Sequence, residues 1–359
     1  MLTWQVPETA FSEEKCMQNI LSRGKLLNDN GELIEKGYAT SLVREYSRED
    51  IKASALRIKE WDYYLIYNQH FALALTIDDN AYMSMLSVSV IDFDTPAETT
   101  ISPIGLFPMG KLNMPPTSAE GISRLRIGNS ELCFTVGNGE RRLSGSLAKS
   151  KNCENFDCDI VLFDEPADSM VIATPFANKP RAFYYNQKII AMRASGRMNF
   201  NGKEYSFDPA VSFGLLDWGR GVWTYRNTWY WGAAQGMADG HTVGFNIGYG
   251  FGDTSAASEN MLFYDGKAHK INDVAFNIPK TEDGRDDFMS PWTFTSSDRR
   301  FEMDFVPVID RKAKTDLLLI GSDQHQVFGR FSGRMRLNNG EVIEIRDFLG
   351  FAEKVKNKW

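Results

Sequence analysis

Short turn signatures recur along this 359-residue chain and constrain its fold more than any other feature. Asn-Gly or Asp-Gly pairs separate short runs rich in apolar residues, at 138–139, 201–202, 265–266 and 339–340. These dipeptides readily adopt the positive φ angles that two-residue β-hairpins require. Beyond residue 61, apolar and polar residues alternate with period two, as in AYMSMLSVSVIDF at 81–93. The pattern predicts an antiparallel all-β protein.

The N-terminal region departs from this pattern. SREDIKASALRIK at 47–59 opens with a Ser-x-x-Asp sequence typical of a helix start, and residues 10–36 are a second helical candidate. Prolines cluster between 95 and 120, where we expect an irregular excursion. The sequence therefore predicts short helices near the N-terminus, followed by hairpins.

An internal repeat indicates two units. SGRMNFNGKEYSF begins at residue 195 and SGRMRLNNGEVIEI at residue 332. Asp217 precedes Trp223 by six residues, and Glu353 precedes Trp359 by six. The sequence assigns no function to Glu353 or Trp359. An offset of about 137 residues, from 195 to 332, suits two tandem antiparallel barrels or half-barrels. We expect units at 1–210 and 211–359, with the boundary between 195 and 225.

Composition and motifs remove several function classes. The net charge is −7 and no Lys/Arg-rich run occurs, which disfavours nucleic acid as a partner. No apolar run approaches the roughly 20 residues that span a bilayer, so stable membrane insertion is not expected. The N-terminus does not resemble a secretory signal, and the cysteines form no Cys-x-x-Cys pair, which favours a reduced cytoplasmic protein. The dinucleotide, P-loop and serine-hydrolase motifs are missing, and the scattered histidines favour no metal site and no cofactor.

The stretch 214–232, GLLDWGRGVWTYRNTWYWG, holds four of the eight tryptophans. If its second half is a strand, Trp229 and Trp231 share one face. Such a face lines a ligand cavity or fills a barrel core, and both interpretations stay open. The candidate ligand-binding residues here are Trp218, Arg220, Trp223, Arg226, Trp229 and Trp231.

Asp217 and Glu259 are the candidate catalytic residues. Tryptophans around Asp217 would desolvate its carboxyl, raise its pKa and suit it to be a general acid. The alternative is a structural ion pair with Arg220 or Arg226, which would lower that pKa. Glu259 is a candidate base, and the adjacent Asn260 a ligand-binding residue; the alternative is a turn that these two side chains cap. Glycines at 244, 248, 250 and 252 leave space beside a strand for a ligand or a crossing strand.

The stretch 184–245 resembles the hydroxyneurosporene synthase (carotenoid 1,2-hydratase) and AttH-like superfamily of double lipocalin-like barrels. The matching elements are the SGRMNFNGKEYSF hairpin, DWG at 217–219, WYW at 229–231 and the Asp-Gly turn at 239–240. In the hydratases, residues separate the acid from the Trp-Gly pair, which are contiguous here. Most of the chain is also similar to the bacterial domain of unknown function 2804 family, through KEWDYY (59–64), DWGRGVW (217–223), FGDTSAASEN (251–260) and GFAE (350–353) before a terminal Trp.

The resemblance implies two lipocalin-like β-units and transfers the acid role to Asp217. With the residues above, it favours a cofactor-independent enzyme that acts on a small apolar or amphiphilic substrate by acid-assisted hydration, isomerisation or elimination. One alternative is a non-catalytic binding protein for a lipid or another small hydrophobic molecule. A second is a carbohydrate-active hydrolase or lyase, which the interleaved aromatic and charged residues suggest. The substrate and the oligomeric state stay open.

Overall fold

The structure is a computed structural model that describes residues 18–316 and 321–358. Two short segments are 3₁₀-helical, η1 (Arg48–Asp50) and η2 (Ala55–Arg57). The first group of strands comprises β1 (Gly24–Lys25), β2 (Gly37–Ala39), β3 (Arg44–Glu45), β4 (Ile58–Tyr67), β5 (Phe71–Asp79), β6 (Met83–Asp92), β7 (Ala97–Ile101), β8 (Ile104–Leu106), β9 (Gly121–Ile127), β10 (Ser130–Gly137), β11 (Glu140–Leu147), β12 (Phe156–Phe163), β13 (Met170–Phe176), β14 (Lys179–Phe200), β15 (Lys203–Phe207) and β16 (Phe213–Val222). The second group comprises β17 (Arg226–Ala238), β18 (His241–Tyr249), β19 (Met261–Tyr264), β20 (Lys267–Lys270), β21 (Val274–Asn277), β22 (Trp292–Ser296), β23 (Phe301–Asp316), β24 (Gly321–Arg336) and β25 (Val342–Lys358).

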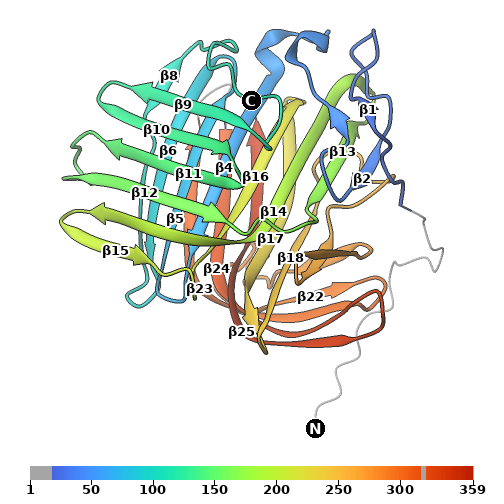
Figure 1. The fold of residues 1–359 in the computed structure, drawn as a ribbon. Coiled ribbons are helices and arrows are strands. Elements are labelled where there is room, and N and C mark those ends of the chain that lie inside the picture. The colour runs from blue at the N-terminus through green and yellow to red at the C-terminus, as the bar shows by residue number, and fades with distance from the viewer. Residues whose placement is uncertain (1–17, 317–320, 359) are drawn as a thin grey trace.

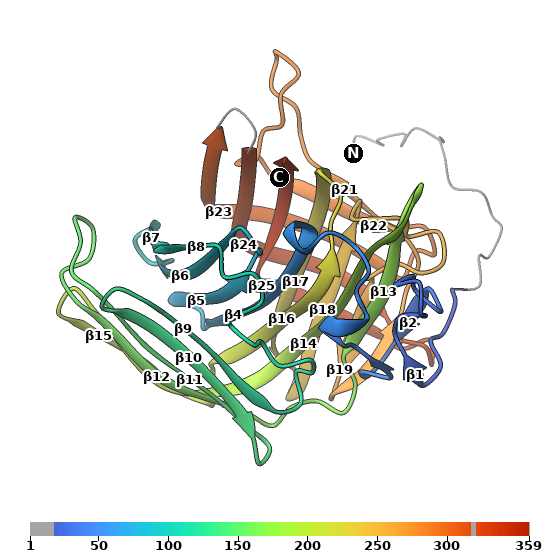
Figure 2. The same cartoon turned by 90° about the horizontal axis from the view of Figure 1, so that it is seen from above.

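Two large antiparallel sheets curl into half-barrels that pack against each other (Figures 1 and 2). The first sheet has the order β7-β6-β5-β4-β16-β14-β12-β11-β10-β9, with β2, β8, β13 and β15 attached at its sides. The second has the order β20-β19-β18-β17-β25-β24-β23-β22-β21. The chain passes from one sheet to the other between β16 and β17, at residues 223–225. The all-β prediction and the two half-barrels are confirmed.

The hairpins follow the turn chemistry, with one difference. Asn138, Asn201 and Asp265 take positive φ, and so do the glycines that follow them. Asn339 does not, because Leu337 N–H bonds to Glu341 O and a longer loop closes this hairpin. A longer loop needs positive φ only at its glycine, so the Asn-Gly pair marks the turn without fixing its length.

The two SGRM segments hold the same place in their sheets. The first lies in β14 between β12 and the β15–β16 pair, and the second lies in β24 between β23 and β25. Gly196 and Gly333 both have positive φ, and a Cβ on either would meet the carbonyl oxygen of the neighbouring strand, at Asp159 and Glu302. The next strands outward also correspond. In the first sheet β14 pairs with β16 and β16 with β4, and in the second β24 pairs with β25 and β25 with β17, so β4 corresponds to β17.

The apolar core forms two clusters. The larger one fills the first half-barrel and the interface between the sheets, and includes residues of the second sheet such as Trp231, Phe328 and Phe351. The smaller one fills the second half-barrel around Phe245, Phe294 and Phe331. The middle parts of β17, β24 and β25 are therefore buried on both faces, one toward their own half-barrel and one toward the first sheet.

The predicted N-terminal helices are wrong. Residues 18–36 are irregular apart from β1, and 47–59 holds only η1 and η2 before β4 begins. Ser47 does accept a hydrogen bond from Glu49 N–H, but the segment ends after one turn, and Arg48 forms an ion pair with Glu60 of β4. Residues 10–17 lie outside the described part of the chain. Within that part, no helix is long and apolar enough to cross a membrane.

Candidate active site

Strand β16 divides the DWGRG motif between the two faces of the first sheet. All ten of its residues are buried, and it pairs with β14 on one side and β4 on the other. Because successive side chains point to opposite faces, Asp217 faces the second sheet, whereas Trp218 and Arg220 point into the first half-barrel. The motif therefore does not form one site.

Asp217 belongs to a buried cluster around a lysine. The Nζ atom of Lys188 lies 3.4 Å from Asp217 Oδ1 and 3.2 Å from Glu259 Oε2. It also donates to Tyr184 Oη at 3.1 Å and to Asn186 Oδ1 at 2.9 Å. Lys188 and Asp217 come from the first sheet and Glu259 from the segment before β19, so the ion pairs join the two halves of the molecule.

Glu353 adds a third carboxyl from β25. Its Oε1 accepts from Trp229 Nε1 at 2.8 Å and its Oε2 accepts from Gln326 Nε2 at 3.0 Å. Burial raises the pKa of Glu353 from 4.5 to about 7, although the Trp229 hydrogen bond opposes this and the charge of Asp217 adds to it. We call Lys188, Asp217, Glu259 and Glu353 the carboxylate cluster.

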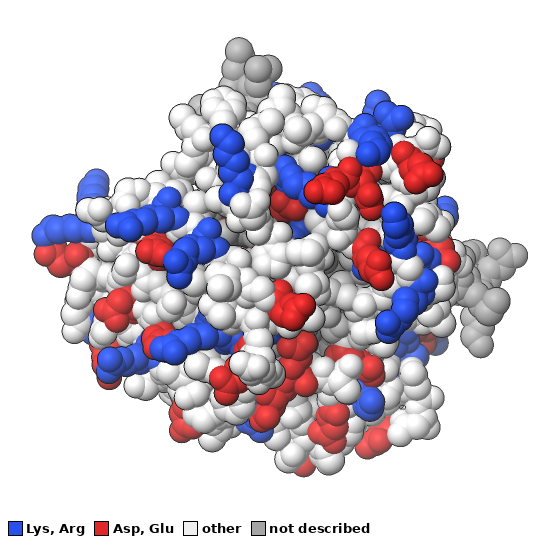
Figure 3. Space-filling view, turned by 45° about the horizontal axis from the view of Figure 1, so that its top comes forward, with Lys and Arg blue, Asp and Glu red and all other residues white. Residues whose placement is uncertain are grey.

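The carboxylate cluster is separate from the charges of the protein surface. On the face in Figure 3, Lys and Arg side chains are interspersed with Asp and Glu. In the cluster, the side chains of Lys188, Asp217 and Glu259 are only 3%, 12% and 8% exposed. Burial alone would lower the pKa of Lys188, but Asp217 and Glu259 outweigh it, and the pKa is raised. The lysine is therefore a fixed cation between two carboxylates.

Asn260 and the glycines of this stretch hold the backbone beside the cluster. Asn260 Oδ1 accepts from Gly248 N–H at 2.8 Å and its amide donates to Asn272 O at 3.0 Å, so it anchors the segment that carries Glu259. A Cβ on Gly248 or on Gly250 would come within 2.9 Å of a carbonyl oxygen of β17. The glycines therefore permit close strand packing, and Asn260 connects this strand to the Glu259 segment.

An aromatic cluster adjoins the carboxylates. Trp61 stacks on Tyr184 with centroids 6.0 Å apart, and Trp223 meets Trp61, Trp229 and Phe251 edge to face. Trp229 and Trp231 lie on the same face of β17, toward the first sheet, and Trp231 Nε1 donates to Asn246. Lys188 Nζ lies 4.6 Å above the Trp231 ring. Tryptophan faces therefore border the carboxylates directly.

The ion-pair partner of Asp217 differs from both arginines considered above. Arg220 bonds to Asp62 at 3.1 Å inside the first half-barrel, and Arg226 is exposed at a strand end. Lys188 lies in YYNQKIIAM at 184–192, where it is the single charged residue, and this was the only signal in the sequence. Glu353 was visible through the repeat, but its position opposite Asp217 depends on how the two sheets pack. Trp359 lies outside the described residues.

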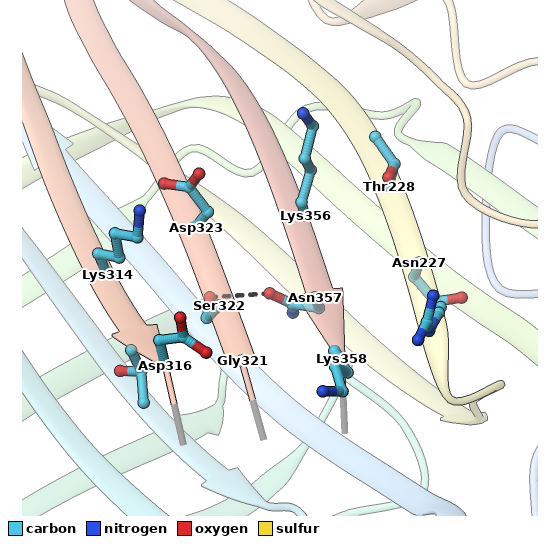
Figure 4. Close-up of a pocket in the computed structure, with 12 residues that line it drawn as sticks. Asn227, Thr228, Lys314, Asp316, Gly321, Ser322, Asp323, Lys356, Asn357 and Lys358 are labelled. Carbon is cyan, nitrogen blue, oxygen red and sulfur yellow. Dashed lines mark hydrogen bonds between the residues drawn. The ribbon is translucent and has the colours of Figure 1, made fainter. Parts of the chain in front are cut away.

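A surface pocket lies at the ends of β17, β23, β24 and β25 (Figure 4). It has a volume of about 500 Å³ and is lined by Arg226 together with lysine, aspartate and amide side chains. Asn357 in its wall, whose Oδ1 accepts from Ser322, lies on the same face of β25 as Glu353, four residues away. Among the described residues, no three His, Cys, Asp or Glu side chains are grouped to hold a metal ion, and Cys133, Cys153 and Cys158 are free thiols.

The two curled antiparallel sheets give the protein the fold of a double lipocalin-like half-barrel. The chain belongs to the family described as domain of unknown function DUF2804, whose model matches residues 17–359. An AttH-like protein from Nitrosomonas europaea has a similar structure at 10% identity and a TM-score of 0.53, with 86% of this chain and 96% of that chain covered.

Kievitone hydratase from Nectria haematococca also matches in structure, at 11% identity and a TM-score of 0.48, with 94% of this chain and 97% of that chain covered. At these identities the likeness concerns the fold alone. No curated protein matches the sequence.

Proposed function

We propose that this protein is a cofactor-independent enzyme that acts on a small organic substrate at the carboxylate cluster. It adds water across a carbon–carbon double bond, or forms such a bond by eliminating water. The observation that carries the proposal is Glu353, a fully buried acid whose pKa is raised to about 7, beside two carboxylates that share a lysine. A pKa near the working pH suits a general acid. The proposal moves the acid role from Asp217 to Glu353.

Glu353 is suited to give up a proton. Each of its oxygens already accepts one N–H, from Trp229 and Gln326. In the neutral acid one oxygen carries a proton, and we assign this proton to a substrate carbon. Gln326 is itself fixed, because its Oε1 accepts from Arg311 at 2.6 Å. The orientation of the acid is therefore held by groups that do not exchange protons at neutral pH.

Asp217 is the more accessible of the two carboxylates paired with Lys188, and we assign it the role of base. In hydration, Glu353 transfers its proton to one alkene carbon, a water oxygen bonds to the other, and Asp217 takes the proton that this water loses. One water is added in total, and the proton returns from Asp217 to Glu353 through solvent. Elimination of water follows the same steps in reverse.

The surroundings favour a cationic transition state. Two carboxylates face a single ammonium group, and the rings of Trp229 and Trp231 border them. Negative charge and aromatic faces stabilise a developing carbocation. The same charges count against a carrier of apolar ligands, since burying unused ionised groups costs stability that apolar side chains would not.

Mass spectrometry in ¹⁸O-labelled water tests the proposal. The purified protein is incubated with a cellular metabolite extract, and metabolites that gain one labelled water are recorded. We expect such products with the wild type and none with Glu353→Gln. Glu341→Gln, at an exposed position outside the cluster, is the matched control and should behave as the wild type does. Equal product formation by wild type and Glu353→Gln, or no labelled product from either, would overturn the proposal.

A further inference from the structure

A second group of buried polar side chains lies inside the first half-barrel, on the opposite face of β16 from Asp217. We call the region around them the chamber. Arg220 is fully buried there, with Nη1 bonded to Trp61 O at 2.8 Å and to Asp62 Oδ1 at 3.1 Å. The ring of Trp218 lies 4.4 Å from its guanidinium carbon. Arg141 is the second buried cation of this interior and pairs with Glu165. These groups take no part in the proposed reaction.

Residues 107–120 cross this chamber, and we call them the strap. They connect β8, which pairs with β6, to β9 at the far edge of the same sheet (Figure 2). The carbonyl of Pro115 accepts from Arg220 Nη2 at 2.8 Å, and that of Ser118 accepts from Arg141 Nη1 at 2.7 Å. The Ser118 hydroxyl also donates to Gln187, and Met114 is buried. The strap thus fills the chamber with its own backbone.

Two buried N–H groups in the chamber have no hydrogen-bond acceptor within the described part of the chain. The Nε of Arg220 and the Nε1 of Trp218 are buried and have no hydrogen-bond partner among the described residues. Buried polar groups in proteins are nearly always paired, so each exception calls for an explanation. Nε and Nη2 form one edge of the guanidinium, and this edge commonly binds a carboxylate through two parallel hydrogen bonds. Asp62 instead accepts from Nη1, so the Nε/Nη2 edge bonds only to the Pro115 carbonyl among the described residues.

The strap is held in an unfavourable conformation. Phe107, Met109 and Asn113 all have positive φ, which non-glycine residues seldom adopt. Phe107 is also 62% exposed, although it is a large apolar side chain. Hydrogen bonds to Ala81 O, Tyr82 O and the Asp79 carboxylate fix the first four residues of the strap. The part around Pro115 is anchored by Arg220, and Ser118 adds bonds to Arg141 and Gln187. An anion that takes over the Arg220 contact would release the Pro115 end of this part.

We propose that the chamber is a second ligand site, for a small organic carboxylate. The carboxylate replaces the Pro115 carbonyl, accepts from Arg220 Nε and Nη2 together, and takes the Trp218 N–H with a remaining lone pair. Its binding withdraws the strap around Pro115. This inference is independent of the proposed function, because it concerns the other face of β16.

Benzoate and benzamide are the probes, since they share shape and differ in charge. Binding is followed by tryptophan fluorescence of the full chain and by hydrogen exchange of the strap amides. We expect benzoate to bind at least tenfold more tightly than benzamide and to speed exchange at 112–120 while β9 is unchanged. Ser118→Ala, which removes the Gln187 bond, should tighten benzoate binding severalfold, because opening then costs less. Arg220→Lys, which lacks the two-donor edge, should weaken it at least tenfold.

Several results would overturn the proposal. One is equal binding of the two probes, and another is a benzoate affinity that neither Ser118→Ala nor Arg220→Lys changes. A third is loss of benzoate binding in Lys314→Gln/Lys356→Gln, which would place the anion in the surface pocket of Figure 4 instead. If Arg220→Lys fails to fold, Ser118→Ala and the exchange measurement still decide. None of these measurements depends on turnover.

Discussion

Asp217 and Glu353 occupy corresponding positions in the two sheets. Asp217 pairs in register with Lys188 on β14 and Tyr63 on β4, and Glu353 pairs with Gln326 on β24 and Trp231 on β17. The partner of Asp217 is a cation, whereas the partner of Glu353 is a neutral amide. A repeated strand arrangement therefore gives two carboxyl groups different surroundings. Burial raises the pKa of Glu353, which has no cation among its register partners.

Glu353→Gln should remove a pH dependence of stability. The folded protein holds the Glu353 proton up to a pKa of about 7, and the unfolded chain releases it at about 4.5. Between these values unfolding releases a proton, so the free energy of unfolding falls as pH rises, by about 3 kcal/mol at most. Urea unfolding at pH values from 5 to 8 measures this change in the free energy of unfolding. The Gln variant should show a flatter profile in this window, and parallel profiles would contradict the assignment.

Lys188→Met should be strongly destabilising. It leaves Asp217 and Glu259 buried without their shared cation, and breaking a buried pair from one side costs about 3–5 kcal/mol. The matched control is Lys203→Met, which removes an exposed pair with Asp92 and should cost less than about 1 kcal/mol. Urea unfolding at pH 7 compares the two. A loss no larger than in the control would mean that Lys188 does not hold the carboxylates.

Gly219→Ala should destabilise the sheet by about 1–3 kcal/mol, as overpacking does. The indole of Trp61 lies directly over Gly219, and an added Cβ would overlap its ring. Gly137→Ala is the control, since nothing lies within 4 Å of a Cβ there. Thermal unfolding of both variants, together with near-UV circular dichroism for the tryptophans, makes the comparison. Equal melting temperatures would show that Trp61 has room to move.

The fold was predictable because its signals are local. Turn dipeptides and period-two alternation specify hairpins within about ten residues, and the SGRM repeat revealed two units before any contact was known. The backbone at the glycine of the SGRM segment explains why this residue occurs in both copies. Gly196 and Gly333 both need positive φ and both leave space for a neighbouring carbonyl. The N-terminal segment misled the helix prediction, because a capping signal at Ser47 does not ensure that a helix continues beyond one turn.

The candidate site was predictable only in part, because it is built from contacts between distant strands. Asp217 and Glu259 were named from sequence, and they do meet, through Lys188. Trp218 and Arg220 were assigned to the same site, yet strand alternation sends them to the other face of β16. Period two would have revealed that separation had β16 been recognised as one uninterrupted strand. No local pattern shows that Glu353 packs against the first sheet, since this depends on the packing of the sheets.

Asp217→Asn tests the coupling between the two carboxyl groups. The negative charge of Asp217 is one cause of the raised pKa of Glu353, so its removal should lower that pKa. Lys188 keeps Glu259 as a partner, and the new amide can still accept from Asn186, so the fold should survive with a lower melting temperature. The measurement is the carboxyl carbon shift of Glu353 against pH, by NMR with labelled glutamate.

The control for this experiment is Asp157→Asn, which changes an exposed carboxylate on β12 that accepts from Asn199. This substitution should leave the titration midpoint of Glu353 unchanged. For Asp217→Asn we expect the midpoint to move to lower pH, and the pH above which activity falls should move with it, because the acid must be protonated to act. Loss of turnover without any shift of the midpoint would make Asp217 a base that is not electrostatically coupled to Glu353. An unchanged midpoint with unchanged turnover would remove Asp217 from the mechanism.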